Sequence, residues 1–144
     1  MKALVYYGNK DIRLEQNWPD PKLKNADDVI LRINFTGICA TDIEEWQYGP
    51  LWMQSEEKNP YSGKMIPLIP GHEITGQIVE LGNNVNELSV GDRVVVNNVI
   101  HCNKCFWCLN GQGGGCSGMC VAGFMDDGGL AEFMRWPASH LIKI

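Results

Sequence analysis

Four cysteines gathered in one short stretch constrain this chain more than any other feature. They read Cys102-Asn-Lys-Cys105-Phe-Trp-Cys108, followed by seven residues and then Cys116. Four thiolates at this spacing can surround one tetrahedral zinc ion, and an all-sulfur site leaves no position open for water or substrate. We therefore predict a structural zinc site that stabilises a lobe rich in glycine and poor in apolar side chains.

Two other chemistries compete for these cysteines. Disulfides would need an oxidising compartment, which nothing else in the sequence indicates. An iron–sulfur cluster suits the opening Cys-x-x-Cys-x-x-Cys, but the bacterial ferredoxin run places its fourth cysteine sooner and a proline after it, whereas Ser117 follows Cys116 here. Zinc is the preferred interpretation. Cys39 and Cys120 lie outside this stretch, and a free buried thiol is the simplest interpretation of each.

Size and charge narrow the class of protein. A chain of 144 residues is long enough for one domain with its own core. The net charge of −5 and the scattered distribution of the 12 basic residues disfavour a nucleic-acid partner. No apolar run reaches the about 18 residues that a membrane helix needs, and the N-terminus does not resemble a secretory signal. We expect a cytoplasmic protein with no nucleic-acid or membrane partner.

Short β-type segments separated by turns account for most of the chain. Alternation and β-branched residues predict strands over residues 2–7, 12–15, 28–35, 74–81, 93–99, 130–136 and 141–144. In the strand 28–35, every second residue from Val29 to Phe35 is expected to face the core. One short helix is predicted over residues 43–48, with Thr41 or Asp42 as its cap. The pattern predicts a mainly β fold, a barrel or a sandwich.

A long proline-rich segment over residues 49–70 separates these strands, and such loops are often functional. Its apolar side chains can either wall a pocket or pack the loop onto the body. The residues suspected of lining a substrate pocket are Glu44, Trp46, Trp52 and Met53.

A second group of residues could also bind a metal. Cys39 and His72 each lie where a strand meets a loop, and they offer zinc a thiolate and an imidazole, with Glu73 as an oxygen ligand. Asp42 could then accept a hydrogen bond from the other ring nitrogen of His72 and so orient it. From residue types alone this second site is weakly supported, because a lone cysteine and a lone histidine are also ordinary core and surface residues.

The motifs around these residues resemble a known family. Gly71-His72-Glu73-x-x-Gly76, then five residues, Gly82, two residues and Val85, resembles the zinc-alcohol-dehydrogenase signature at every fixed position. Similar matches are Gly37-Ile38-Cys39-x-Thr41-Asp42, residues 90–94, residues 127–132 and the spacing of the four cysteines. The chain is identified as similar to the N-terminal, GroES-like catalytic domain of the medium-chain dehydrogenases/reductases. The loop over residues 61–67 looks most like that of the butanediol and polyol dehydrogenases.

The resemblance implies a fold and an activity. The fold would be a partly open GroES-like β-barrel with few short helices and a four-Cys zinc lobe. Cys39 and His72 would bind a catalytic zinc, with Glu73 as a ligand or near-ligand, and Thr41 would pass the alcohol proton toward solvent, with Asp42 behind His72. Zinc would act as a Lewis acid on the oxygen of a secondary alcohol or polyol, which is oxidised to its ketone by hydride transfer to NAD or NADP.

Three features depart from the family pattern. Ala40 replaces the usual glycine after the ligand cysteine, and Glu44 stands where many relatives have a histidine of the proton relay. The sequence also contains no strand–Gly-x-Gly-x-x-Gly–helix unit. We therefore expect residues 1–144 to be one domain of a longer enzyme, without its nucleotide-binding domain or its remaining zinc ligand and inactive alone, and the full enzyme to be a homo-oligomer.

One alternative to this interpretation stays open. The chain could be a free-standing zinc-stabilised β-domain with a binding or structural role, in which Cys39 and His72 are plain core residues. A relative of the quinone reductases without catalytic zinc is disfavoured, because those proteins lack the pair Cys39 and His72 and the four-Cys lobe.

Overall fold

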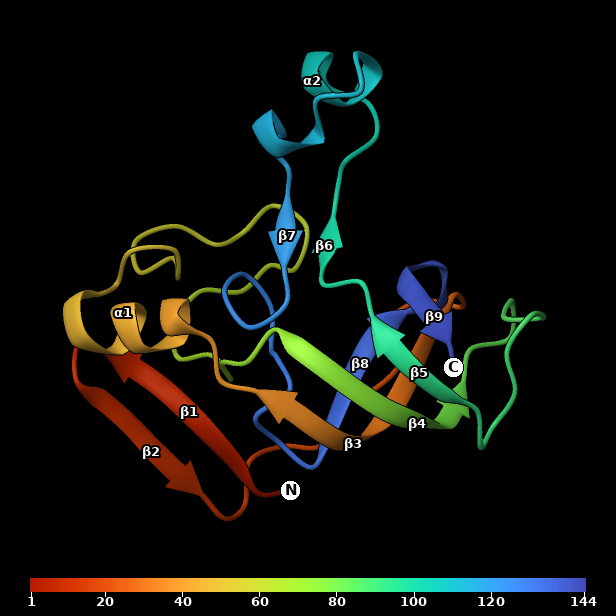
Figure 1. The fold of residues 1–144 in the computed structure, drawn as a ribbon, viewed down its shortest axis with the longest axis horizontal. Helices are drawn as coiled ribbons and strands as arrows, with labels where there is room; N and C mark the ends of the chain where they lie inside the picture. The colour runs from red at the N-terminus through yellow and green to blue at the C-terminus, as the bar shows by residue number, and fades with distance from the viewer.

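A five-stranded antiparallel sheet forms the body of the molecule, and a small lobe projects from it (Figure 1). The computed structural model describes all residues 1–144. The strands are β1 (Ala3–Gly8), β2 (Asp11–Glu15), β3 (Asp28–Gly37), β4 (Glu73–Leu81), β5 (Arg93–Val96), β6 (Val99–Ile100), β7 (Cys120–Val121), β8 (Phe133–Pro137) and β9 (Leu141–Lys143). The helices are α1 (Ala40–Tyr48) and α2 (Phe106–Leu109), with 3-10 turns η1 (Gly113–Gly115) and η2 (Ala138–His140). The prediction of a mainly β fold with few short helices is confirmed.

The main sheet curls toward a barrel because of how its edges are connected. Its strand order is β8-β3-β4-β5-β9, so β8 and β9 lie at opposite edges although only η2 separates them in the chain. Four residue steps span at most about 14 Å, whereas the edges of a flat five-stranded sheet would be about 19 Å apart. Trp136 Nε1 donates to the carbonyl oxygen of Asn97 at 3.0 Å and links the ends of β8 and β5. The sheet is therefore partly closed.

Most of the apolar core lies against this sheet. Its largest cluster combines side chains from β3, β4, β5, β8 and the lobe stem: Val29, Leu31, Ile74, Ile78, Val94, Val96, Ile100, Cys120, Ala122, Met134 and Trp136. A second cluster of Tyr6, Met53, Leu68 and Phe124 lies between β1 and the loops. Cys120 is fully buried and free, as the sequence indicated.

The expected alternation in β3 is wrong at both ends of the strand. Ile30 is buried together with Val29 and Leu31, while Phe35 is 79% exposed. The first half of β3 is covered on both faces: Val29 and Leu31 belong to the main core cluster, while Ile30 lies on the opposite face with the buried Asp28 and pairs with the buried Arg135 of β8. In the second half, the register with β4 shifts between Ile33 and Phe35, and this bulge turns the Phe35 side chain outward.

Two further boundaries differ from the prediction. The expected strand over residues 93–99 breaks into β5 and β6, because residues 94–96 pair with β9 whereas Val99 and Ile100 pair with β7 in the lobe stem. Helix α1 begins three residues earlier than predicted, and its N-cap residue is Cys39 rather than Thr41 or Asp42.

The hairpin β1–β2 holds helix α1 by its C-terminal carbonyl groups. The backbone amide of Lys10 donates to Trp46 at 2.7 Å, Asn9 Nδ2 donates to Gln47 at 2.8 Å, and the Tyr6 hydroxyl donates to Glu45 at 3.2 Å. The bonds to Trp46 and Gln47 satisfy carbonyl groups that a helix end leaves unpaired, and the carbonyl of Glu45 also accepts the capping bond from the Gly49 amide. They fix the position of α1, and hence of Cys39 at its start.

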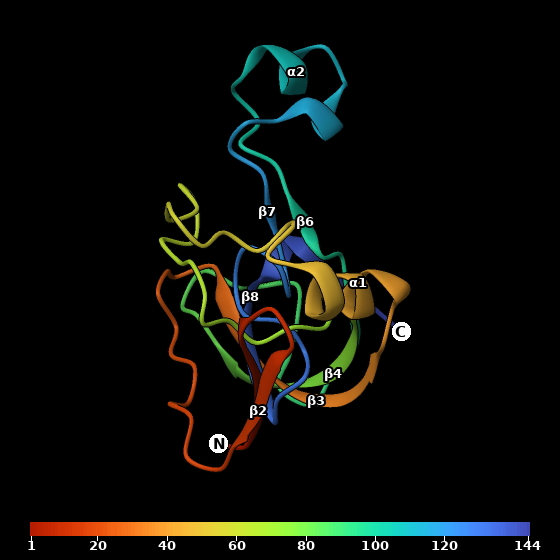
Figure 2. The same ribbon diagram turned by 90° about the vertical axis from the view of Figure 1, so that its left-hand side faces the viewer.

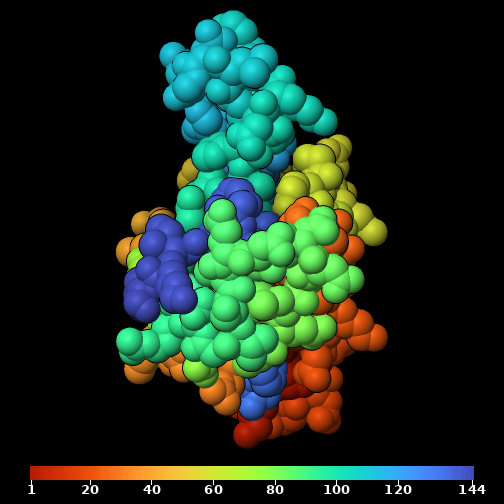
Figure 3. All heavy atoms as spheres, turned by 90° about the vertical axis from the view of Figure 1, so that its right-hand side faces the viewer, coloured from red at the N-terminus to blue at the C-terminus, as the bar shows by residue number.

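The four-Cys lobe stands away from the body on the two strands β6 and β7, as two perpendicular views show (Figures 1 and 2). A space-filling view shows the lobe as a separate protrusion above the sheet (Figure 3). No helix in the chain combines the length and the apolar character needed to cross a membrane.

Candidate metal centres

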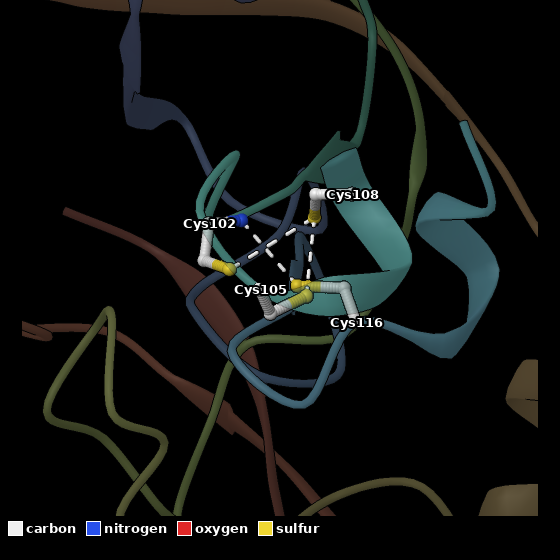
Figure 4. Close-up of side chains that lie close together, drawn as sticks. All are labelled: Cys102, Cys105, Cys108 and Cys116. Carbon is white, nitrogen blue, oxygen red and sulfur yellow. Dashed lines mark hydrogen bonds between the residues drawn. The ribbon is translucent and has the colours of Figure 1, made fainter. Parts of the chain in front are cut away.

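The lobe that carries the four cysteines has almost no core of its own. Neither α2 nor η1 contains a buried residue, and Phe106 and Leu109 are exposed. Cys105 caps the start of α2, which directs Cys105 and Cys108 toward the same side. Figure 4 shows the sulfur atoms of Cys102, Cys105, Cys108 and Cys116 gathered around one point.

The spacing of the four sulfur atoms fits zinc. All four lie within 4.8 Å of one another. The Sγ atoms of Cys102 and Cys108 are 3.9 Å apart, and those of Cys105 and Cys108 are 3.5 Å apart. A tetrahedral ion with Zn–S bonds of about 2.3 Å requires sulfur–sulfur distances of about 3.8 Å. The backbone amide of Cys102 also donates to Cys116 Sγ at 3.4 Å, which supports the charge of a thiolate.

The electrostatics of the lobe favour a cation at its centre. A hydrogen bond from the backbone of Lys104 is the main cause that lowers the pKa of Cys102 to about 6. Desolvation, followed by the hydrogen bond with Cys105, raises the pKa of Cys108 to about 12. Cys102 therefore favours the thiolate and Cys108 the neutral thiol, and a divalent cation would favour the thiolate form of its ligands.

The second cluster is assembled by the pairing of β3 with β4. Gly37 at the end of β3 is the register partner of Glu73 at the start of β4. Cys39 lies two residues after Gly37 and His72 lies one residue before Glu73, so this pairing brings them close together. The ligand atoms of Cys39, His72 and Glu73 lie within 4.8 Å of one another. A Cβ at position 37 would lie 2.2 Å from Glu73 Oε2, so the glycine makes room for the carboxylate.

Asp42 connects Cys39 with His72. Its Oδ2 accepts a hydrogen bond from the Cys39 backbone amide at 2.9 Å, and its Oδ1 lies 3.4 Å from His72 Nδ1. The side chains of Asp42 and His72 are only 6% and 12% exposed, and these two facing atoms have no other partner. With Nδ1 directed at Asp42, Nε2 is the nitrogen that is available to a metal.

The hydroxyl group of Thr41 lies beside the imidazole. Its Oγ1 lies 3.5 Å from His72 Nε2, and the residue is partly exposed. The structure thus brings together Cys39, Thr41, Asp42, His72 and Glu73, which the sequence analysis had named. It separates them from the four-Cys lobe, as expected for two independent sites.

The residues suspected of lining a pocket are dispersed. Met53 is buried in the cluster with Tyr6 and Phe124, while Glu44, Trp46 and Trp52 are exposed. Two surface depressions of about 600 and 690 Å³ lie elsewhere on the body, and Cys39, His72 and Glu73 line neither of them.

Sequence reasoning missed Glu45, Asn98 and Phe124. The Glu45 carboxylate is buried and accepts three backbone hydrogen bonds from residues 51–53. Asn98 and Phe124 contact His72. Of these three, only Glu45 could have been identified from the sequence pattern, because it lies one helical turn after Asp42, on the face of α1 that turns toward the body.

Comparison with known proteins agrees with this geometry. Residues 25–144 match the model of the alcohol dehydrogenase GroES-like domain. The chain is 31% identical to the (R,R)-butanediol dehydrogenase of Saccharomyces cerevisiae over all of this chain and 42% of that protein. It is 34% identical to D-arabinitol dehydrogenase 1 of Uromyces fabae, over 100% of this chain and 37% of that protein.

A solved structure supports the same relationship. The 2R,3R-butanediol dehydrogenase from Bacillus subtilis superimposes with a TM-score of 0.89 and 29% identity, covering 99% of this chain and 40% of that one. The present chain thus spans well under half the length of the relatives it matches.

Proposed function

Because the chain belongs to the alcohol dehydrogenase GroES-like domain family, we propose that it provides the zinc-binding catalytic domain of an enzyme that interconverts an alcohol and its ketone with NAD or NADP. The observation that carries this proposal is the cluster of Cys39, His72 and Glu73, whose ligand atoms lie within 4.8 Å of one another. The closed set of four cysteines in the lobe would hold a second, structural zinc.

The residues of the cluster have distinct roles in this proposal. Cys39, His72 and Glu73 would hold the catalytic zinc, which when bound acts as a Lewis acid on the alcohol oxygen. Asp42 would keep the proton of His72 on Nδ1 and leave Nε2 free. Thr41, which is partly exposed and 3.5 Å from Nε2, would carry the alcohol proton toward solvent.

The relatives support a substrate class for this proposal, and the chain itself bears on where the cofactor binds. Those named above act on a butanediol or an arabinitol by their printed names, which supports a secondary alcohol or polyol as substrate. All strand pairings in the three sheets are antiparallel, and the sequence has no Gly-x-Gly-x-x-Gly unit after a strand. We propose that residues outside this sequence bind the nicotinamide cofactor and provide a further zinc ligand. The homo-oligomeric state stays a prediction.

Metal content tests the two sites separately. We expect one tightly held zinc per chain from the lobe, and a second that binds at excess zinc and is lost first to a chelator. Cys39→Ser or His72→Gln should remove only the second, and Cys105→Ser should remove the first. Cys120→Ser, in a buried cysteine outside both clusters, should retain both. Retention of the second zinc by both Cys39→Ser and His72→Gln would contradict the proposed site.

Enzyme activity tests whether residues outside this sequence are needed to bind the cofactor. We expect the 144-residue chain alone to show no NAD-dependent oxidation of 2R,3R-butanediol, because it has no dinucleotide-binding unit of its own. Measurable turnover by this chain would contradict the proposal that the cofactor is bound elsewhere.

A further inference from the structure

The imidazole of His72 lies against the aromatic ring of Phe124. The ring centroids are 4.8 Å apart and the planes are inclined by 35°, within the range of favourable aromatic pairs. The ring nitrogens lie on the edges of the imidazole, so a ring packed on its face leaves Nδ1 directed at Asp42 and Nε2 free. Phe124 is outside every motif that the sequence analysis used.

Phe124 is itself held firmly in place. Its side chain is buried in the cluster of Tyr6, Met53 and Leu68. Its backbone lies in a tight turn in which the amide of Phe124 donates to Val121 at 3.2 Å. Because both the side chain and the backbone of Phe124 are held in place, its ring can restrict the movement of a neighbouring side chain.

The turn that carries Phe124 packs directly against the residue before His72. Gly123 has a φ of 79°, and a Cβ at this position would lie 2.6 Å from the carbonyl oxygen of Gly71. Only glycine permits both this conformation and this close approach. In addition, Asn98 Nδ2, from the segment between β5 and β6, donates to the carbonyl oxygen of His72 at 3.0 Å. Contacts with the turn at Gly123 and with Asn98 thus fix the backbone at His72, while Phe124 packs against its ring.

We propose that Phe124 is a positioning residue for His72, which sets the plane of the imidazole and blocks its rotation so that Asp42 can keep the proton on Nδ1. In this proposal Asp42 determines which nitrogen of His72 carries the proton. Phe124 prevents the imidazole from rotating by half a turn, which would direct Nδ1 away from Asp42. The consequence for metal binding rests on the proposed zinc site, but the orientation of the ring can be measured without metal.

Nitrogen-15 NMR of the histidine side chains tests this inference in the zinc-free second site, at a pH where the imidazoles are neutral. The chain has three histidines, so His72→Gln assigns the His72 signals and the other two serve as references. In the unaltered chain we expect one tautomer, with an observable Nδ1 proton. Phe124→Leu should broaden that proton signal and mix the tautomers, whereas Phe124→Tyr, which retains the ring, should restore them.

Zinc titration of the same variants provides the second measurement. With the lobe already filled, the affinity of the second zinc should fall about ten-fold in Phe124→Leu, a loss typical of disturbing the support of a ligand histidine. Leu68→Val is the matched control, because it weakens the same apolar cluster without a ring contact to His72.

The outcomes separate the two proposals. An unchanged Nδ1 proton signal in Phe124→Leu would overturn the positioning role, and so would an equal loss in Leu68→Val. If the unaltered chain shows a single tautomer but its His72 signals do not move on addition of zinc, the proposed metal site fails while the positioning role stands.

Discussion

The buried carboxylate of Glu45 organises the start of the long loop after α1. Its oxygens accept hydrogen bonds from the backbone amides of Leu51 and Trp52, both at 2.8 Å, and of Met53 at 3.4 Å. The side chain has almost no exposure to solvent. Hydrogen bonds between a buried charge and backbone amides are stronger than neutral ones, so this single residue ties the loop to the helix.

We therefore expect Glu45→Ala to lower the free energy of unfolding by about 2–3 kcal/mol, because three backbone amides lose a buried, charged acceptor. Urea denaturation measures this loss, and faster hydrogen exchange at residues 51–53 would localise it. The adjacent Glu44 is exposed, so Glu44→Ala is the matched control and should cost little. Equal effects of the two substitutions would contradict the role given to Glu45.

Tyr6 makes the stability of the fold sensitive to alkaline pH. Burial, followed by the charge of Glu45, raises the pKa of Tyr6 to about 12, whereas an unfolded tyrosine titrates near about 10. Between these values the folded state retains a proton that the unfolded state has lost, so the free energy of unfolding falls as pH rises through this window.

Tyr6→Phe should accordingly flatten the alkaline limb of a stability profile between about pH 10 and 12. Denaturation at a series of pH values measures it. Tyr48→Phe, at an exposed tyrosine, should leave the slope as it is. A slope that does not change in Tyr6→Phe would show that other groups cause the alkaline loss.

At the scale of the elements, the four-Cys lobe is the part whose order depends most on metal. It has no apolar core beyond Cys116, and its helical turns contain no buried residue. A segment of this kind cannot offset its conformational entropy by burial alone, and the proposed zinc ion would supply the missing stability.

Removal of zinc by a chelator should therefore accelerate hydrogen exchange in residues 102–116 by a large factor and leave β3 and β4 protected. Exchange measured by mass spectrometry would resolve the two regions. Cys105→Ser should reproduce the effect, while Cys120→Ser should not. Loss of protection in the central sheet would mean that the lobe is not an independent unit.

The elements also show what a sequence can and cannot predict. The strands and the lobe were predictable because their signals are local: alternation, β-branched residues and four cysteines at short spacing. The break after Val96 was not predictable, because it depends on a change of pairing partner from β9 to β7 across the fold. The cluster around His72 depends on the pairing of Gly37 with Glu73, so only the resemblance to a family could link its members beforehand.

At the scale of the whole molecule, Arg135 joins distant parts of the chain through buried charges. Its guanidinium contacts Asp28 at 3.3 Å and also pairs with Asp126, and all three side chains are buried. Lys64 from the long loop lies 3.2 Å from Asp126 and pairs with Asp127. The network therefore connects β3, β8, the long loop and the segment before β8.

Arg135→Met should destabilise the fold by about 3–5 kcal/mol, because it leaves the buried carboxylate of Asp28 without its cation and that of Asp126 with Lys64 alone. Thermal or urea denaturation measures this loss. Lys143→Met is the comparison, because Lys143 is 58% exposed in its pair with Asp92 and should cost at most about 1 kcal/mol. Similar losses in both variants would contradict the structural role of the network.

The stem of the lobe has a consequence for how such a protein can change over time. Ile100 and Cys120 are register partners, so the chain leaves the body and returns to it at one place. Residues 101–119 can therefore be regarded as a cassette whose ends already meet, and a two-residue hairpin turn could close the gap. Evolution can lengthen, exchange or delete such a cassette, and a designer can graft another loop there, without rebuilding the sheet beneath it.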